Sequence, residues 1–306
     1  MRRVLLWMAG SPWLRDRLPR LWFVRRAVRR FMPGEDAAAA LNAGQQAQAL
    51  GIGSLYTRLG EHLTRPDEAA AVADHYLGVL EAIAERKLPG EVSIKPSQLG
   101  LDLDPSATFE HAARLAAHAE KLDGFVWLDM ESSESTEPTL ALYEQLRAIH
   151  PNVGVCLQAA LHRTAGDLQR LLPMGPAIRL VKGAYAEPRA IAYQGRHEID
   201  ANFAALAAEM LGAARGGTPI RIALGTHDVG LIEQVDTHAG AFGLDRTGFE
   251  VQMLYGVRID EQRRLAASGY RVRQLISYGE SWYAWYMRRL AERPANVLFA
   301  LRAILG

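Results

Sequence analysis

The stretch FVWLDMESSESTEPTLALYEQLRAIHPNVGVCLQ, residues 125–158, decides the fold. It opens with an apolar run at Phe125–Asp129 and closes with a second run at Val153–Gln158. Between them, Glu137–Ile149 carries apolar residues at three- and four-residue steps. Short apolar runs rich in β-branched and aromatic residues predict buried strands, and the intervening periodicity predicts an amphipathic helix. A strand, a helix and a second strand form the unit from which parallel sheets are built.

The same alternation extends over most of the chain. Six further apolar runs predict strands, at Ser54–Leu59, Val92–Lys95, Ile178–Lys182, Ile220–Leu224, Phe249–Leu254 and Val272–Ser277. Helical periodicity recurs at Phe109–Leu122, Ile199–Ala214 and Glu261–Ala267, and an Ala-rich helix is expected between Asp36 and Gly51. Eight strands that alternate with helices predict an α/β protein with a (β/α)8 barrel. A doubly wound open sheet is the alternative.

Length and composition fit one large core. A chain of 306 residues accommodates such a barrel, which needs about 250 residues. Cys156 is the only cysteine, which excludes an internal disulfide and fits a reducing compartment. The apolar stretch Val4–Ala9 is too short for a signal-peptide core, and no run approaches the ~18 residues that span a bilayer. We therefore expect a cytoplasmic location.

Several classes of site have no motif in the sequence. It contains no G-x-G-x-x-G, G-x-x-x-x-G-K-[ST], H-E-x-x-H or C-x-x-C, so nothing indicates a Rossmann dinucleotide site, a P-loop, a zincin or a zinc ribbon. The histidines also lack close ligand spacing, so we expect no metal.

Residues 1–32 carry a large excess of positive over negative charge. They contain nine arginines and one aspartate, a net charge of +8, whereas the whole chain has a net charge of +1. Trp, Leu and Phe are interleaved with these arginines, which is typical of a helix on the anionic inner face of a cell membrane. The alternative is a helical arm that packs its apolar side on the main domain. We expect no nucleic-acid partner, because no reader motif accompanies the charge.

Polar side chains follow the apolar interiors of the predicted strands. They are Lys95, Asp129, Gln158, Lys182, Thr226, His227 and Gln252. In α/β barrels the reacting groups gather at the C-terminal ends of the strands, so these side chains predict one active site. A further helix is expected at Ser281–Asn296, where the adjacent Arg288 and Arg289 are suited to clamp a carboxylate.

Six short segments together carry a family resemblance. They are RLVKGAY at 179–185, FVWLDME at 125–131, LGE at 59–61, TH at 226–227, FEVQ at 249–252, and the segment from 288 to 296. They resemble the signatures of FAD-dependent proline dehydrogenases of the monofunctional bacterial type, over residues 34–302. The resemblance implies a distorted (β/α)8 TIM barrel whose last helix lies over the barrel mouth. It also implies oxidation of L-proline to Δ1-pyrroline-5-carboxylate, with hydride transfer to FAD and electrons passed on to a membrane quinone.

The resemblance assigns roles to individual residues. On the substrate side these are Arg288 and Arg289 at the carboxylate, Lys95 and Asp129 beside them, Glu61 as an ion-pair partner of Arg288, and Leu180 and Tyr185 in the pocket wall. The residues implied around the FAD are Gln158, Arg179, Val181, Lys182, Gly183, Ala184, Thr226, His227, Gln252 and Glu292. Arg179 and Lys182 would supply positive charge to a diphosphate or to a reduced flavin.

Two positions depart from the family pattern near the expected pocket. Leu275 stands where the family has the tyrosine of a Tyr-x-Pro-x-Gly segment, and Ala160 stands where it has the tyrosine of Gln-Ala-Tyr-Leu. Both changes concern the substrate more than the reaction. The small-molecule substrate is therefore either L-proline or an imino acid with a larger or substituted ring, such as pipecolate or 4-hydroxyproline.

We expect a helical N-terminal arm over residues 1–50 and a flavin-binding catalytic barrel over residues 51–306. Two other functions stay open. Lys95 or Lys182 at a strand end would also suit a Schiff-base aldolase. A barrel that only binds membranes would use residues 1–32 and would have no need of the polar strand ends.

Overall fold

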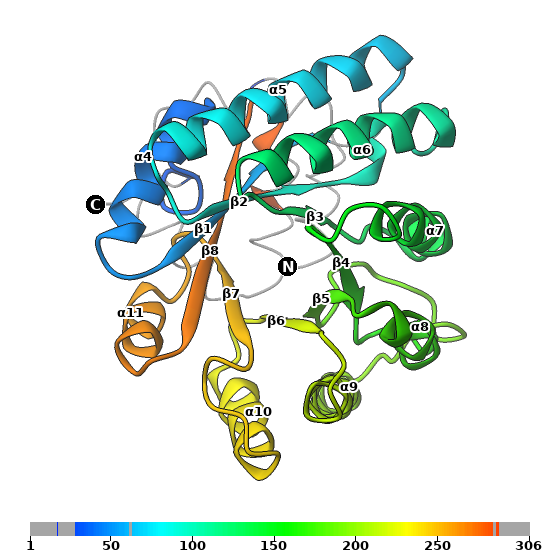
Figure 1. Ribbon diagram of the computed structural model, residues 1–306, viewed down its shortest axis with the longest axis vertical. Helices are drawn as coiled ribbons and strands as arrows, with labels where there is room; N and C mark the ends of the chain where they lie inside the picture. The colour runs from blue at the N-terminus through cyan, green and yellow to red at the C-terminus, as the bar shows by residue number, and fades with distance from the viewer. Residues whose placement is uncertain (1–16, 18–27, 61–62, 284–285, 288–306) are drawn as a thin grey trace.

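The structure is a computed structural model that describes residue 17 and residues 28–60, 63–283 and 286–287. Its eight parallel strands follow one another around a closed barrel (Figure 1). They are β1 (Gly53–Arg58), β2 (Gly90–Ile94), β3 (Val126–Leu128), β4 (Val153–Gln158), β5 (Ala177–Val181), β6 (Arg221–Gly225), β7 (Glu250–Leu254) and β8 (Arg271–Tyr278). β8 pairs with β1 along its length, which closes the ring. The predicted barrel is confirmed, and the open sheet is wrong because the ring has no free edge.

Each predicted strand lies within two residues of an observed one. β4 has the predicted bounds, and β3 is shorter than predicted at each end. The strands are nearly continuous runs of buried residues, because helices cover their outer face and side chains fill the barrel. Strands buried on both faces are apolar throughout, and this gives the sequence its clear signal.

Helices surround the strand ring in Figure 1. They are α4 (Ala37–Gln48), α5 (Pro66–Glu85), α6 (Pro105–Lys121), α7 (Thr136–Arg147), α8 (Thr164–Leu171), α9 (Arg196–Arg215), α10 (Val229–Ala241) and α11 (Ile259–Ala267), with short 3-10 turns η2 (Pro96–Leu99), η3 (Ser133–Ser135) and η4 (Leu172–Met174). Local chemistry sets their ends. The Asp36 carboxylate caps α4 by accepting a hydrogen bond from the Ala39 N–H at 2.7 Å. Pro66 and Pro105 are the first residues of α5 and α6, a position whose N–H has no acceptor within the helix, so a proline costs no hydrogen bond there.

α4 occupies an unusual place for its position in the chain. It precedes β1, yet it packs on both β8 and β1. Its approach is close, since a Cβ at Gly44 would lie 1.8 Å from the hydroxyl of Tyr56 on β1. In a regular (β/α)8 barrel each helix follows its own strand, so the outer groove between β8 and β1 would receive the helix after β8. Here α4 covers that groove.

Two apolar layers lie on opposite sides of the strands. The outer layer packs the strands against the helices. The inner layer contains Leu55, Trp127, Ala177 and Ala223, which come from four strands and no helix and therefore lie inside the barrel, and Phe125 and Leu275 pack against them. β4 makes room for the indole of Trp127, because a Cβ at Gly154 would come within 2.6 Å of that ring. This interior layer fixes which face of each strand points inward.

A cluster of four charged side chains, which we call the barrel floor, closes the N-terminal end of the strands. The Arg221 guanidinium contacts Glu91 at 2.8 Å and Glu250 at 2.9 Å, and Arg273 contacts the same two carboxylates at 3.0 and 3.2 Å. Burial alone would raise the pKa of the Glu250 carboxyl, but the charges of Arg221 and Arg273 outweigh it and lower that pKa. Arg221 also lies 4.4 Å over the ring of Phe125. Two positive and two negative charges balance here, as suits a structural end of the barrel.

Candidate active site

The opposite end of the barrel carries the polar side chains that the sequence singled out. Side chains alternate along a strand, so the residues two positions beyond Leu55, Trp127 and Leu275 share their inward face. By this alternation the inward positions at the C-terminal ends are Thr57, Lys95, Asp129, Gln158, Val181, Leu254 and Ser277. The structure therefore brings Lys95, Asp129, Gln158 and Val181 to one mouth.

Arg179 on β5 lies two residues before Val181 and shares its inward face. Its side chain is 4% exposed, and its Nη1 donates to Asp129 Oδ1 at 2.7 Å. Both Nη atoms donate to the Ser93 hydroxyl at 3.0 Å, and that hydroxyl donates to Asp129 at 2.9 Å. The guanidinium carbon lies 4.8 Å from the centroid of a Trp127 ring. Arg179 Nε is buried and has no hydrogen-bond partner among the described residues. The Nε–H group is therefore a donor that a bound ligand could use.

The loop that carries Lys95 is held by a buried carboxylate. Lys95 ends the apolar run of β2 and directly precedes the turn η2. Glu131, which follows β3, accepts hydrogen bonds from the N–H of Ser97 at 3.0 Å and from its hydroxyl at 2.6 Å. Gln158 Nε2 in turn donates to the Glu131 carbonyl at 3.0 Å. No role for Glu131 itself is predicted from the sequence. The only sign of it in the sequence is a carboxylate two residues after Asp129, and this spacing is too common to predict a particular role.

The exit from β5 exposes main chain at the mouth. Gly183 has a φ of +110°, in the region that favours glycine, and both Gly183 and Ala184 are exposed. A Cβ at Gly183 would come within 3.0 Å of the Ala160 Cβ and 3.3 Å of Gln158 Oε1. The glycine therefore leaves the peptide groups after β5 bare, so that a flat ligand can approach them closely.

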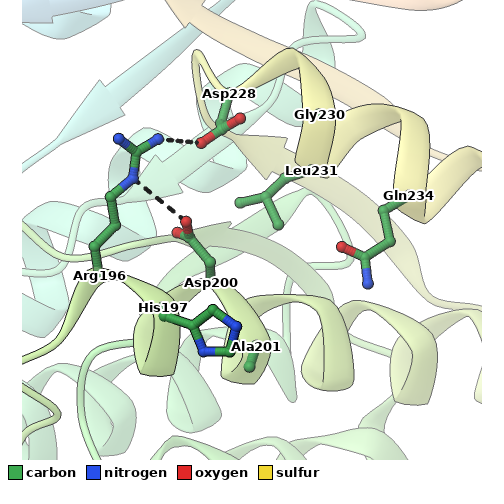
Figure 2. Close-up of a pocket in the computed structure, with 8 residues that line it drawn as sticks. All are labelled: Arg196, His197, Asp200, Ala201, Asp228, Gly230, Leu231 and Gln234. Carbon is green, nitrogen blue, oxygen red and sulfur yellow. Dashed lines mark hydrogen bonds and ion pairs between the residues drawn. The ribbon is translucent and has the colours of Figure 1, made fainter.

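Lys182 belongs to a second charged group with Asp200 and Asp228, which line a cavity of about 630 Å³. Figure 2 shows the residues around this cavity. The cavity is lined by Arg196, His197, Asp200, Ala201, Asp228, Gly230, Leu231 and Gln234 from the first turns of α9 and α10. Lys182 Nζ pairs with Asp200 and, at 2.9 Å, with Asp228, which also pairs with Arg196 at 2.9 Å. Burial alone would raise the pKa of the Asp228 carboxyl, but hydrogen bonds from Lys182 and Arg196 lower it to about 2. The cavity wall is thus ionic and adjoins two helix N-termini, which favour anions.

Residues after β6 and within β7 complete this side of the mouth. Thr226 Oγ1 accepts a hydrogen bond from the Asp228 N–H at 3.1 Å. The Leu254 N–H donates to His227 Nε2 at 3.4 Å, an arrangement that leaves the imidazole proton on Nδ1. Gln252 donates to the Glu250 carboxylate of the barrel floor, and its Oε1 is buried without a hydrogen-bond partner in the described part of the chain. Gln252 therefore offers an acceptor toward the interior.

Some expected site residues lie elsewhere. Leu180 is buried in the outer layer, because alternation along β5 turns Arg179 and Val181 inward and Leu180 toward the helices, so the expectation that Leu180 walls the pocket needs correction. Tyr185 lies in the loop after β5 and is 37% exposed. Four expected residues lie outside the described residues: Glu61, Arg288, Arg289 and Glu292.

The described residues lack two features. They contain no group of three or more His, Cys, Asp or Glu side chains placed to hold a metal ion. Within the same residues, no helix has the length and apolar character needed to cross a membrane.

Comparisons with known proteins identify the family and the fold of the chain. The family model described as Proline dehydrogenase matches residues 40–302. Proline dehydrogenase 1 of Bacillus subtilis (strain 168) is 33% identical over 305 residues, which cover 100% of this chain and 99% of that protein. Proline dehydrogenase of Deinococcus radiodurans is 36% identical over 314 residues, which cover 99% and 97%. The solved structure of proline utilization A (PutA) from Bdellovibrio bacteriovorus, inactivated by N-propargylglycine, has a TM-score of 0.80 at 22% identity over 87% of this chain. This chain covers 32% of that protein, and the likeness shows a shared fold.

Proposed function

The chain belongs to the proline dehydrogenase family, and from this membership we propose that it oxidises L-proline, or a closely related cyclic imino acid, to Δ1-pyrroline-5-carboxylate with FAD as hydride acceptor and a quinone as the final acceptor. The relatives that carry the family name match over nearly their whole length, so the proposal concerns the entire chain. The site geometry supports the flavin and substrate parts of this proposal.

The residues of the mouth fit a flavin. An isoalloxazine ring presents acceptors and one N–H donor along its edge, and the mouth holds a buried donor at Arg179 Nε and a buried acceptor at Gln252 Oε1 that lack partners in the described structure. The bare main chain at Gly183 and Ala184 suits the approach of a flat ring. Lys182 and the helix N-termini around the cavity of Figure 2 suit the diphosphate.

A bound flavin would accept a hydride from the carbon next to the substrate nitrogen. The Arg179 guanidinium is the observation that carries the proposal, because it fixes positive charge inside a closed barrel where negative charge would develop. It is preorganised by Asp129, Ser93 and the ring of Trp127, so it needs no rearrangement during the reaction. Asp129 remains an acceptor that can orient a substrate N–H, and Lys95 lies on the neighbouring strand end.

Arg288 and Arg289 would bind the substrate carboxylate. Guanidinium groups match a carboxylate with two parallel hydrogen bonds, which fixes orientation as well as position. With the carboxylate held there and the nitrogen near Asp129, the reacting carbon would be presented to the flavin in one orientation.

A specific observation favours a larger or hydroxylated ring as the second candidate substrate. Leu275 lies inside the barrel against the inner apolar layer. Directly beyond it on the same face, Ser277 is opposite Thr57 in the β1–β8 pairing, and both are at least 95% buried. These wall residues include no phenol, and Ser277 places one hydroxyl on the inward face, toward a ring substituent.

The experiment is an absorbance scan followed by anaerobic addition of L-proline, pipecolate or 4-hydroxyproline. We expect flavin bands that bleach with at least one of the three. A colourless protein that borohydride inactivates only in the presence of a carbonyl substrate would instead indicate the Schiff-base aldolase. In that reading Lys182 is poorly placed, because its Nζ is already paired with the carboxylates of Asp200 and Asp228. If the protein contains no flavin and turns over no substrate, the remaining hypothesis is a barrel that only binds membranes.

We further propose that residues 1–32 bring the enzyme to the inner face of the cell membrane, where a quinone is available. The net charge of +8, interleaved with Trp and Leu, supports this proposal. The division into an arm over residues 1–50 and a barrel over 51–306 is proposed with it.

A further inference from the structure

A long loop, residues 183–195, connects β5 to α9, and both of its ends are tied to the chain after β4. At the near end, the Ala160 N–H donates to the Lys182 carbonyl at 2.8 Å. At the far end, the Tyr193 N–H donates to the Ala160 carbonyl at 2.9 Å, and the rings of His162 and Tyr193 meet edge-on, 4.5 Å apart. The two ends of the loop are therefore fixed beside the same strand end.

The middle of this loop presents its main chain to solvent at the mouth. All of residues 183–190 are exposed except Glu187, which is partly buried. Pro188 follows it, and a proline restricts the residue before it to extended backbone. A carboxylate that turns inward from an otherwise exposed segment loses hydration, so it needs hydrogen bonds in exchange.

Ser133 supplies these hydrogen bonds. Its N–H donates to Glu187 Oε1 at 2.8 Å, and its hydroxyl donates to Oε2 at 2.6 Å. Ser133 begins η3, four residues beyond Asp129. Each carboxylate oxygen thus has its own donor, and hydrogen bonds to a charged acceptor are stronger than those between neutral groups. The Glu187 carboxylate therefore joins the exits of β5 and β3, which are not neighbours in the ring.

A second link joins the same two strands inside the mouth. There, Arg179 on β5 pairs with Asp129 after β3 at 2.7 Å. Gly183 lies four residues after Arg179 and four residues before Glu187. The exposed peptide groups of Gly183 and Ala184 thus lie between two points at which the chain is held against the exit of β3.

We propose that Glu187 is a positioning residue for the flavin: its two hydrogen bonds from Ser133 hold the main chain of Gly183 and Ala184 at the mouth in the arrangement that the flavin binds. The inference rests on the proposed function for the identity of the ligand. A glycine permits main-chain conformations that other residues rarely adopt, so a loop without this link has more arrangements open to it. Holding one arrangement in advance lowers the entropy cost of binding, so loss of the link weakens flavin binding.

The chain offers matched variants. Glu187→Ala removes both acceptors, Glu187→Gln keeps one acceptor oxygen, and Ser133→Ala removes only the hydroxyl donor. Glu134→Ala is the control, because Glu134 adjoins Ser133 but is exposed and makes no hydrogen bond to the loop in the described part of the chain.

Serial dilution of the full-length holoenzyme, with flavin fluorescence reporting the released FAD, gives the Kd for FAD. We expect this Kd to rise about tenfold in Glu187→Ala, the effect of one to two net hydrogen bonds. Ser133→Ala and Glu187→Gln should raise it less, and the double variant Glu187→Ala/Ser133→Ala should not exceed Glu187→Ala. The Kd of Glu134→Ala should equal that of the wild type. A contact that only stabilises the fold would lower the urea midpoint and leave the Kd unchanged.

A second readout needs no flavin. Trypsin cleaves after arginine, and Arg189 is exposed two residues beyond Glu187. Mass spectrometry reports the rate of cleavage after Arg189 in the full chain. We expect this rate to rise several-fold in Glu187→Ala over both the wild type and Glu134→Ala, because the middle of the loop is no longer held.

Either readout can overturn the positioning role. A Kd for FAD in Glu187→Ala within about twofold of the wild type does so, as does an equal rise in Glu134→Ala or an unchanged cleavage rate after Arg189. If Glu187→Ala does not fold, Glu187→Gln and Ser133→Ala decide by the same comparison. A wild type that binds no FAD overturns the proposed function instead, and the cleavage rates then still decide whether Glu187 holds the loop.

Discussion

Arg288 and Arg289 are the residues on which substrate binding is expected to depend most. We expect Arg288→Met or Arg289→Met to lower kcat/KM for the imino acid by about 30-fold or more, because the substrate carboxylate would lose a charge-assisted partner. Arg170→Met is a matched control, since that arginine pairs with Glu144 and Glu137 on the outside of α7 and α8. The clamp assignment is wrong if either site variant keeps the kcat/KM of the control.

Leu275 is expected to set the substrate range. A phenol introduced by Leu275→Tyr would fill the space beside Leu55 and narrow the pocket. We expect the wild type to prefer pipecolate or 4-hydroxyproline over L-proline, and the variant to shift the ratio of kcat/KM values toward L-proline by about 10- to 200-fold. The measurement is kcat/KM for the three imino acids with both proteins. A wild type that strongly prefers L-proline, with the same ranking in Leu275→Tyr, would contradict the assignment.

Individual residues differ in how far the sequence could place them. Asp129 and Gln158 were predictable, because each ends or follows an apolar strand whose C-terminal end must face the mouth. Arg179 lies in the middle of β5, and only the family resemblance implied a role for it. The orientation of Leu180 was not predictable. Side chains alternate between the two faces of a strand, so a one-residue error in the alternation assigns every side chain to the wrong face. The barrel floor was missed as well. Its members lie up to about 180 residues apart in sequence, and only closure of the ring brings Glu91 to Arg273.

At the scale of elements, α5 and β8 share a hydrogen bond that should respond to pH. His75 Nε2 on α5 lies 2.8 Å from the Tyr278 hydroxyl. Burial, and then the charge of Arg58, lower the pKa of His75, whereas burial raises the pKa of Tyr278. The neutral imidazole therefore accepts and the phenol donates.

This pair makes stability depend on pH in a defined window. Above the unfolded-state pKa of about 6.5, His75 is neutral in both states and its contribution is complete. As the pH falls through that value and then through the lower folded-state pKa, the unfolded chain takes up the proton first and the contribution is lost.

We therefore expect the difference in unfolding free energy between wild type and His75→Gln to shrink as the pH falls from 7.5 to 5. Urea titrations at several pH values measure it. His118→Gln on α6 is the control, because His118 lies near the surface beside Glu81. A difference that stays constant over this range would contradict the assigned role of His75.

Element boundaries were predictable to within two residues for the strands and less so for the helices. The α6 prediction began at Phe109, whereas the helix begins at Pro105, because Asp104 caps the polar turn that precedes the apolar pattern. The place of α4 could not be predicted. Its small buried residues indicate a close contact, but no local pattern says that the partners are β1 and β8.

The molecule as a whole is expected to bind anionic membranes through its N-terminal residues. Residues 2–27 contain seven arginines and one aspartate and lie before Phe31, whose ring packs against Tyr286, so their deletion leaves that contact in place. We expect co-sedimentation with phosphatidylserine vesicles to fall on this deletion and to fall with added salt, because each basic residue near such a surface contributes about 1 kcal/mol. Equal sedimentation of both proteins would contradict the membrane role.

The position of α4 has a consequence for the order of folding. α4 is complete after residue 48, but one of its two strands, β8, begins only at Arg271. During synthesis at about 5–20 residues per second, the apolar face of α4 therefore waits for tens of seconds before its second partner exists. β1 waits for the same strand. Because these contacts join the two ends of the sequence, ring closure is the step of highest contact order, and we expect it to come last.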